Sequence, residues 1–140
     1  MSNWKTILVG IDGSQPSRSA LRWAADQAER NQCELVALNA WTRTLILSGA
    51  ATSVGEVPDP AEGATSVLLQ SIVEELGENP PVKVQPVVKE GNPARILEMS
   101  ADADLLVVGT RGHGGFAGLL LGSVSQHVAA YARCTVVVVR

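Results

Sequence analysis

Five short apolar runs, separated by segments with helical spacing, constrain the fold of this chain more than any other feature. The runs occupy residues 5–11, 34–41, 82–88, 104–109 and 134–139. Three of them are nearly continuous in valine, leucine and isoleucine, which is typical of parallel strands covered on both faces. The run at 82–88 alternates and contains Pro86, which favours an edge position. This alternation predicts an α/β fold, with a doubly wound, five-stranded parallel sheet and helices on both faces.

Each interval between the runs carries a helix-start signal. Ser14, Asp59, Asn92 and Ser123 stand where helices are expected to begin, and proline directly follows Asp59 and Asn92. The first helix is predicted to bury one face made of Ala20, Leu21, Ala24, Ala25 and Ala28. The second is predicted to turn inward Val67, Leu68, Ile72, Val73 and Leu76.

The size and charge of the chain favour one domain without a polyanionic partner. Its 140 residues, 46% hydrophobic and 18% charged, suffice for a single core over 1–140. A net charge of −3 gives no general attraction for nucleic acid or for an anionic membrane. The segment from Thr42 to Pro58 is small and polar, and we expect a mobile loop or lid there.

Targeting signals and cysteine usage favour a cytoplasmic protein. The N-terminal stretch reaches the acidic Asp12 too early for a secretory signal, and no apolar run is long enough to span a membrane. Cys33 and Cys134 lack a metal-ligand spacing, and each adjoins an apolar run, so we expect both to be small buried residues.

Ligands of open α/β sheets bind outside the carboxyl ends of the strands, where the strand order reverses. Two sequence features fall at such ends: Gly10-Ile11-Asp12-Gly13-Ser14 and the glycine-rich stretch 109–123. Its glycines allow a concave nest of backbone N–H groups, Gly122-Ser123 supplies a helix start, and Arg111 adds a planar cation. Asp12 would repel phosphate, so we predict that it accepts hydrogen bonds from ribose hydroxyls. The same residues also permit a tight turn in which Asp12 merely caps the first helix.

The glycine pattern separates three classes of nucleotide site. No glycine is followed by lysine, so the phosphate-binding loop of the usual ATP hydrolases is absent. "GHGGFA" at 112–117 matches a dinucleotide fingerprint by letter, but no acidic residue follows at ribose distance. The third pattern is G-x2-G-x9-G-[ST], formed by Gly109, Gly112, Gly122 and Ser123.

This third pattern, together with "ILVGIDGS" and the closing "VSQHVAAYARCTVVVV", resembles the universal stress protein family in its single-domain form. The resemblance implies the strand order 3-2-1-4-5 of an adenine nucleotide alpha hydrolase-like fold. It implies ATP as the ligand, in the subgroup that keeps the glycine motif. It also implies a homodimer through the last strand, 134–140, whose apolar edge would suit a partner.

Site residues follow from the same resemblance. Asp12 would contact ribose or adenine, Gly10 and Ile11 would form the floor, and Ala40 and Val88 would flank the adenine with backbone groups. The ribose and phosphates would be surrounded by Gly109, Arg111, Gly112, Gly114, Gly115, Gly122, Ser123, Val124 and Ser125. The sequence has no carboxylate cluster for a metal cage of protein ligands, so any Mg²⁺ would arrive with ATP.

Three functions remain open from the sequence. The first is an ATP-binding regulatory protein of the stress response. The second is a slow ATPase or a self-phosphorylating enzyme that uses Ser123 or a nearby hydroxyl. The third is a dimeric scaffold without nucleotide. Because no set of nucleophile, base and orienting group is apparent, with His127 expected to play a surface or packing role, we predict no catalytic residue.

Overall fold

The computed structural model describes residues 3–42, 59–100, 102–110 and 121–140. In chain order, these ranges form β1 (Thr6–Gly10), α1 (Gln15–Asn31), β2 (Glu34–Trp41), α3 (Pro60–Leu76), β3 (Val84–Glu90), α4 (Pro93–Glu98), β4 (Leu105–Gly109), α5 (Ser123–Tyr131) and β5 (Thr135–Val139). Of the segment 42–58, predicted as a mobile loop or lid, residues 43–58 lie outside the described residues. None of the helices in the described ranges combines the length and apolar character needed to cross a bilayer.

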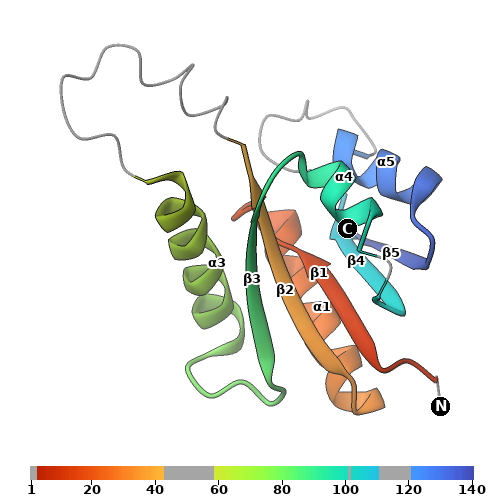
Figure 1. The fold of residues 1–140 in the computed structure, drawn as a ribbon. Coiled ribbons are helices and arrows are strands. Elements are labelled where there is room, and N and C mark those ends of the chain that lie inside the picture. The colour runs from red at the N-terminus through yellow and green to blue at the C-terminus, as the bar shows by residue number, and fades with distance from the viewer. Residues whose placement is uncertain (1–2, 43–58, 101, 111–120) are drawn as a thin grey trace.

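The sheet has the order β3-β2-β1-β4-β5 and is parallel throughout, which confirms the predicted fold class and strand order. The strand with Pro86 lies at one edge, as predicted, and β5 lies at the other. From β1 the chain builds outward through β2 to β3, then returns to place β4 on the other side of β1 (Figure 1). The strand order therefore reverses between β1 and β4, which is where this architecture leaves a crevice.

Two apolar layers cover the sheet, because successive strand residues point to opposite faces. Ile7 and Val9 of β1 pack with α1 and α3, whereas Leu8 packs on the opposite face with α4 and α5. Figure 1 shows these helix pairs on the two sides of the sheet. All five apolar residues predicted for the inner face of α1 are buried.

The inner face of α3 is narrower than the sequence predicts. Leu68 and Ile72 are buried and Leu76 is half-buried, but Val67 and Val73 are 37% and 47% exposed, so their predicted burial is wrong. Each helical residue turns the side chain by about 100°, which carries residues 67 and 73 off the stripe centred on Leu68. The stripe is completed by Ala64 and Ser71 instead.

Three of the four predicted helix starts are capped as expected. Ser14, Asp59 and Asn92 each accept a hydrogen bond from a backbone N–H of the first turn. The last helix, α5, begins at Ser123 as predicted, but Gly122 and not Ser123 occupies its cap position. The reason is conformational: Gly122 is extended, with φ −78° and ψ 175°, and its N–H donates to the Thr110 carbonyl at 2.5 Å.

The two cysteines are free thiols in different surroundings. Cys33 is buried against α1, as predicted, and its Sγ lies 3.1 Å from the Trp4 carbonyl oxygen. Cys134 is half-buried where β5 begins, so it is more exposed than predicted. Burial raises the pKa of both thiols, which disfavours the reactive thiolate.

Candidate functional site

A cavity opens at the carboxyl ends of β1, β2 and β4, on the side of the sheet covered by α4 and α5. Its empty volume is about 540 Å³, a figure that includes the part open to solvent. Its lining consists of Gly10, Ile11, Asp12, Ser17, Leu38, Asn39, Ala40, Pro93, Leu97, Val108, Gly109, Val124 and Ser125. The cavity thus lies where the strand order reverses.

The structure brings half of the predicted site residues to this cavity. Those that line it are Gly10, Ile11, Asp12, Ala40, Gly109, Val124 and Ser125. Val88 pairs with Asn39 across the sheet and packs toward α1 and α3, so it is not among the lining residues. Gly122 and Ser123 begin α5 without lining the described part of the cavity. The remaining predictions, Arg111, Gly112, Gly114 and Gly115, lie outside the described residues.

The site predictions missed the contribution of α4 to the cavity. Pro93 and Leu97 come from this helix, and Leu97 is 4% exposed. The Asn92-Pro93 pair identifies a helix start, but it carries no signal for the strand ends over which that helix packs. Leu38, Asn39 and Val108 sit just before strand ends, and Ser17 lies in the first turn of α1. A rule that takes the last four residues of each strand would have found Leu38, Asn39 and Val108.

Asp12 is held in one orientation by the turn that follows β1. Its Oδ1 accepts hydrogen bonds from the Ser14 N–H at 2.9 Å and from the Ser14 hydroxyl. Its own N–H donates to Ser17 Oγ at 3.3 Å. The turn needs Gly13, which has φ +85°, a conformation that strains side-chain-bearing residues. The carboxylate at the cavity wall is therefore preorganised.

Gly109 is required by packing. A Cβ built on it would lie 2.5 Å from the carbonyl carbon and 2.6 Å from the carbonyl oxygen of Pro16. The first turn of α1 therefore passes directly over the end of β4. This contact explains the first glycine of the motif whether or not a nucleotide binds.

The start of α5 forms another wall of the cavity through Val124 and Ser125. Gly122, at the cap position of this helix, has no side chain with which to cap it, in contrast to the cap residues of α1, α3 and α4. The hydroxyl of buried Ser125 donates to the Gly109 carbonyl at 2.5 Å and lies 3.1 Å from the Thr110 carbonyl. Ser125 therefore links the start of α5 to the end of β4, because its hydroxyl donates its hydrogen bond to a backbone carbonyl. The helix start itself has the positive dipole end that favours an anion.

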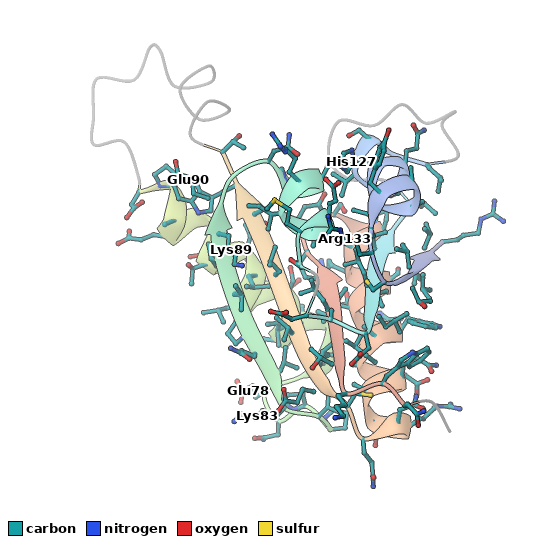
Figure 2. The ribbon with its side chains drawn as sticks, turned by 45° about the vertical axis from the view of Figure 1, so that its right-hand side comes forward. Glu78, Lys83, Lys89, Glu90, His127 and Arg133 are labelled. Carbon is teal, nitrogen blue, oxygen red and sulfur yellow. The ribbon has the colours of Figure 1, made fainter. Side chains whose placement is uncertain are left out.

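The walls at α4 and α5 are joined outside the cavity by a contact between a histidine ring and a carboxyl group. His127, labelled on α5 in Figure 2, places Nε2 2.9 Å from Glu98 Oε2 on α4, and each side chain is 31% exposed. The His127 ring also lies 4.9 Å from that of Tyr131. These contacts agree with the packing role expected for His127. Within the described ranges, no three His, Cys, Asp or Glu side chains gather closely enough to hold a metal ion.

Asp12 also borders a second, more polar hollow between α1 and α3. Its other lining residues are Gly13, Arg18, Val67, Gln70, Ser71 and Glu74. Arg18 pairs with Glu74 at 2.6 Å and with Glu75 at 2.9 Å, and Arg22 pairs with Glu75 at 2.5 Å. Burial by itself would raise the pKa of Glu75, but the hydrogen bonds and charges of Arg22 and Arg18 lower it overall. These pairs fasten α3 to α1.

The model of the universal stress protein family matches residues 3–140. The chain belongs to the universal stress protein family. Universal stress protein Rv2623 of Mycobacterium tuberculosis is 39% identical over 140 residues, covering 96% of this chain and 44% of that protein. The chain thus spans less than half the length of this curated relative.

Solved universal stress proteins share the fold over the whole chain. UspA from Lactobacillus plantarum superposes with a TM-score of 0.79 at 24% identity and full coverage of both chains. A universal stress protein in complex with cAMP superposes with a TM-score of 0.64 at 27% identity, covering 99% of this chain and 98% of the other. A member of this family is therefore known to bind an adenine nucleotide.

Proposed function

We propose that this universal stress protein binds ATP in the cavity at the ends of β1, β2 and β4, and acts as a nucleotide-dependent regulator in the stress response. The observation that carries the proposal is the composition of the cavity wall. The acidic residue Asp12, an apolar surface and the first turn of α5, whose cap residue Gly122 has no side chain, border one space. These groups match the ribose, the base and the phosphates of a nucleotide respectively.

Each part of ATP has a proposed position. The adenine would lie against the apolar wall of Leu38, Ala40 and Leu97, above a floor of Gly10 and Ile11. Its ribose hydroxyls would donate to Asp12. The phosphates would lie toward the start of α5, with the proposed participation of Gly109, Arg111, Gly112, Gly114, Gly115, Gly122, Ser123, Val124 and Ser125. Val88 would contribute its backbone, and Mg²⁺, where present, would come with the phosphates.

Support for the adenosine half comes from the relative in complex with cAMP, which contains adenine and ribose. Support for a triphosphate comes from the glycine spacing between Gly109 and Ser123. The missing lysine after the glycines favours holding ATP over rapid hydrolysis. The free thiols Cys33 and Cys134 suit the reducing cytoplasm, where we propose that the protein acts.

The direct test is to denature freshly purified protein and to chromatograph the small molecules it releases. We expect an adenine nucleotide, and saturable ATP binding by calorimetry once the protein is stripped, measured with and without Mg²⁺. Failure to find either released nucleotide or ATP binding would overturn the proposal.

A Gly122→Glu variant tests the position of the phosphates. Gly122 has an ordinary negative φ, so a side chain there would not strain its backbone, and the new carboxylate would stand beside the proposed phosphates. We expect ATP binding to be lost while the fold is kept. Gly63→Glu is the matched control, because a side chain at this site in α3 would meet no atom within 4 Å. Equal ATP affinity in both variants would place the phosphates elsewhere.

Incubation with γ-labelled ATP separates binding from turnover. We expect bound label to be recovered as ATP, without phosphate release above background and without labelled protein. Labelling that disappears in Ser123→Ala would instead favour the self-phosphorylating alternative, since Ser123 is exposed at the first position of α5.

A further inference from the structure

We propose that Leu97 of α4 closes the apolar end of the cavity and thereby sets an upper limit on the size of the base that the protein accepts. The inference rests on the proposed nucleotide function and names a residue that determines ligand choice. Leu97 belongs to the cavity wall and is 4% exposed. Its contribution comes from α4, outside the strand ends and the glycine-rich stretch from which the site was predicted.

The side chain of Leu97 lies directly on the end of β1. A Cβ built on Gly10 would lie 3.0 Å from Leu97 Cδ1 and 3.6 Å from Leu97 Cδ2. Leu97 thus occupies the space that a side chain at position 10 would otherwise take. Because Gly10 also lines the cavity, Leu97 ends the cavity at this point.

Contacts on both sides of Leu97 in the chain hold it in this place. Before α4, the Gly91 N–H donates to the Trp41 carbonyl at the end of β2, at 2.7 Å. Directly after Leu97, Glu98 Oε2 lies 2.9 Å from Nε2 of His127 on α5. The helix that carries Leu97 is therefore linked to β2 and to α5, so we expect the wall to resist displacement by a larger ligand.

Neutral polar side chains of the wall are engaged with the backbone. Ser17, Asn39 and Ser125 are buried, and each donates a hydrogen bond to a backbone carbonyl, at 2.9, 2.9 and 2.5 Å respectively. Apolar side chains, among them Leu38 and Leu97, make up much of the remaining lining. At this wall the choice among bases therefore depends on shape more than on hydrogen bonds from side chains.

A closed apolar wall discriminates by size, because in such a pocket one methylene group changes affinity by about 10- to 200-fold. We expect the wild-type protein to bind ATP about tenfold or more tightly than an analogue whose base carries an additional apolar group at the edge that faces Leu97. Leu97→Ala removes Cγ and both Cδ atoms and so extends the cavity over Gly10. The enlarged analogue should then gain about tenfold in affinity relative to ATP.

The experiment is calorimetric titration of nucleotide-free protein with ATP, N6-benzyl-ATP and 2-methylthio-ATP. The two analogues are enlarged at different edges of the adenine, so the test does not require knowing which edge faces Leu97. In Leu97→Ala, the dissociation constant of at least one analogue, divided by that of ATP, should fall about tenfold. Leu97→Val is a smaller truncation that should shift the same ratio in the same direction, and it decides the test if Leu97→Ala does not fold.

Leu106→Ala is the matched control for a loss of core packing. Leu106 is 1% exposed and belongs to the same apolar cluster as Leu97, but it is not among the residues that line the cavity. We expect this variant to lose stability without changing the ratio. If Leu97 served packing alone, its truncation would move the ratio no more than this control does.

The outcomes distinguish the two proposals. ATP binding with unchanged ratios in the Leu97 variants, or with equal changes in Leu97→Ala and Leu106→Ala, overturns the role of Leu97 and leaves the proposed function standing. Equal wild-type affinity for ATP and both analogues also overturns that role, because the wall then sets no limit on size. Absence of any nucleotide binding overturns both proposals.

Discussion

At Gly109 the backbone of β4 passes so close to Pro16 that no side chain fits between them. The glycine pattern led us to expect a phosphate cradle there, yet the described contacts already require this glycine for folding. A ligand role and a packing role coincide at one residue. Substitutions in the motif therefore need a stability measurement beside every binding measurement.

We predict that Gly109→Ala destabilises the protein by about 1–3 kcal/mol even without nucleotide, since the new methyl group overlaps the Pro16 backbone. Urea unfolding of the nucleotide-free protein measures this. Gly63→Ala is the matched control, because its methyl group meets nothing within 4 Å, and it should stabilise α3 by up to about 1 kcal/mol. Equal stability of the two variants would contradict the packing explanation.

Among the secondary-structure elements, α3 shows how a helix can be predicted correctly in place and yet wrongly in orientation. Its cap at Asp59 is as predicted, but Val67 and Val73 face outward. The sequence of α3 is apolar on more than one side of the helix, so the spacing of its apolar residues is compatible with more than one buried face. The pairing of Arg18 and Arg22 with Glu75 contributes to the choice, because it ties one side of α3 to α1.

Two truncations test this orientation. Leu68 is fully buried, so Leu68→Ala should cost about 2–5 kcal/mol in free energy of unfolding. Val73 is 47% exposed, so Val73→Ala should change it by no more than about 0.5 kcal/mol. Thermal or urea unfolding distinguishes them, and a large loss from Val73→Ala would mean that α3 packs through a different face.

The acid sensitivity of the fold follows from two carboxylates. The pKa of Asp104 is lowered by hydrogen bonds from the N–H groups of Lys5 and Thr6, and that of Glu75 is lowered overall by Arg22 and Arg18. A carboxyl with a lower pKa in the folded state stabilises the protein fully above its unfolded pKa, about 3.9 for aspartate and 4.3 for glutamate. That stability is lost as the pH falls through the folded pKa.

We therefore predict that the free energy of unfolding drops between about pH 5 and pH 3. In this range the pH falls through the unfolded pKa values of aspartate and glutamate, which lie near 4, toward the lower folded values. In Glu75→Gln the protein should be less stable at neutral pH and should lose less on acidification. Urea titrations across this range provide the measurement. A variant whose loss on acidification equals that of the wild type would contradict the role of Glu75.

In the molecule as a whole, β5 is one of the two edge strands of the sheet. Its valines Val136 and Val138 pack toward one face, and Val137 and Val139 pack toward the other, but all four remain half-buried. We propose that a second copy of the chain pairs along 134–140, since an apolar edge favours a partner. Such a pair would bring two domains together.

Sedimentation velocity tests the dimer. We expect a mass twice the 14.7 kDa of the chain, and dissociation when Thr135, which is exposed, is replaced by lysine. Gln85→Lys places the same charge on the opposite edge, in β3, and should leave the dimer intact. A monomeric wild-type protein, or equal dissociation in both variants, would exclude pairing through β5.

The sequence by itself determined what depends on near neighbours in the chain. Valine and leucine runs placed the five strands, serine, aspartate and asparagine placed three helix starts, and the spacing of Ala20, Leu21 and Ala24 identified the inner face of α1. It also placed the crevice, because parallel strands align their carboxyl ends. These features follow from periodicity and from capping, which are local.

Tertiary structure decided what depends on contacts between distant segments. It selected Leu68 and Ser71 as the inner face of α3, brought Leu97 of α4 to the cavity, and pressed Pro16 against Gly109. Ser14 combines a predicted and an unpredicted feature. Its cap of α1 was predicted from the sequence, but its hydrogen bond to Asp12 depends on the turn at Gly13. Periodicity indicates which residues share a side of a helix, and only packing decides what that side meets.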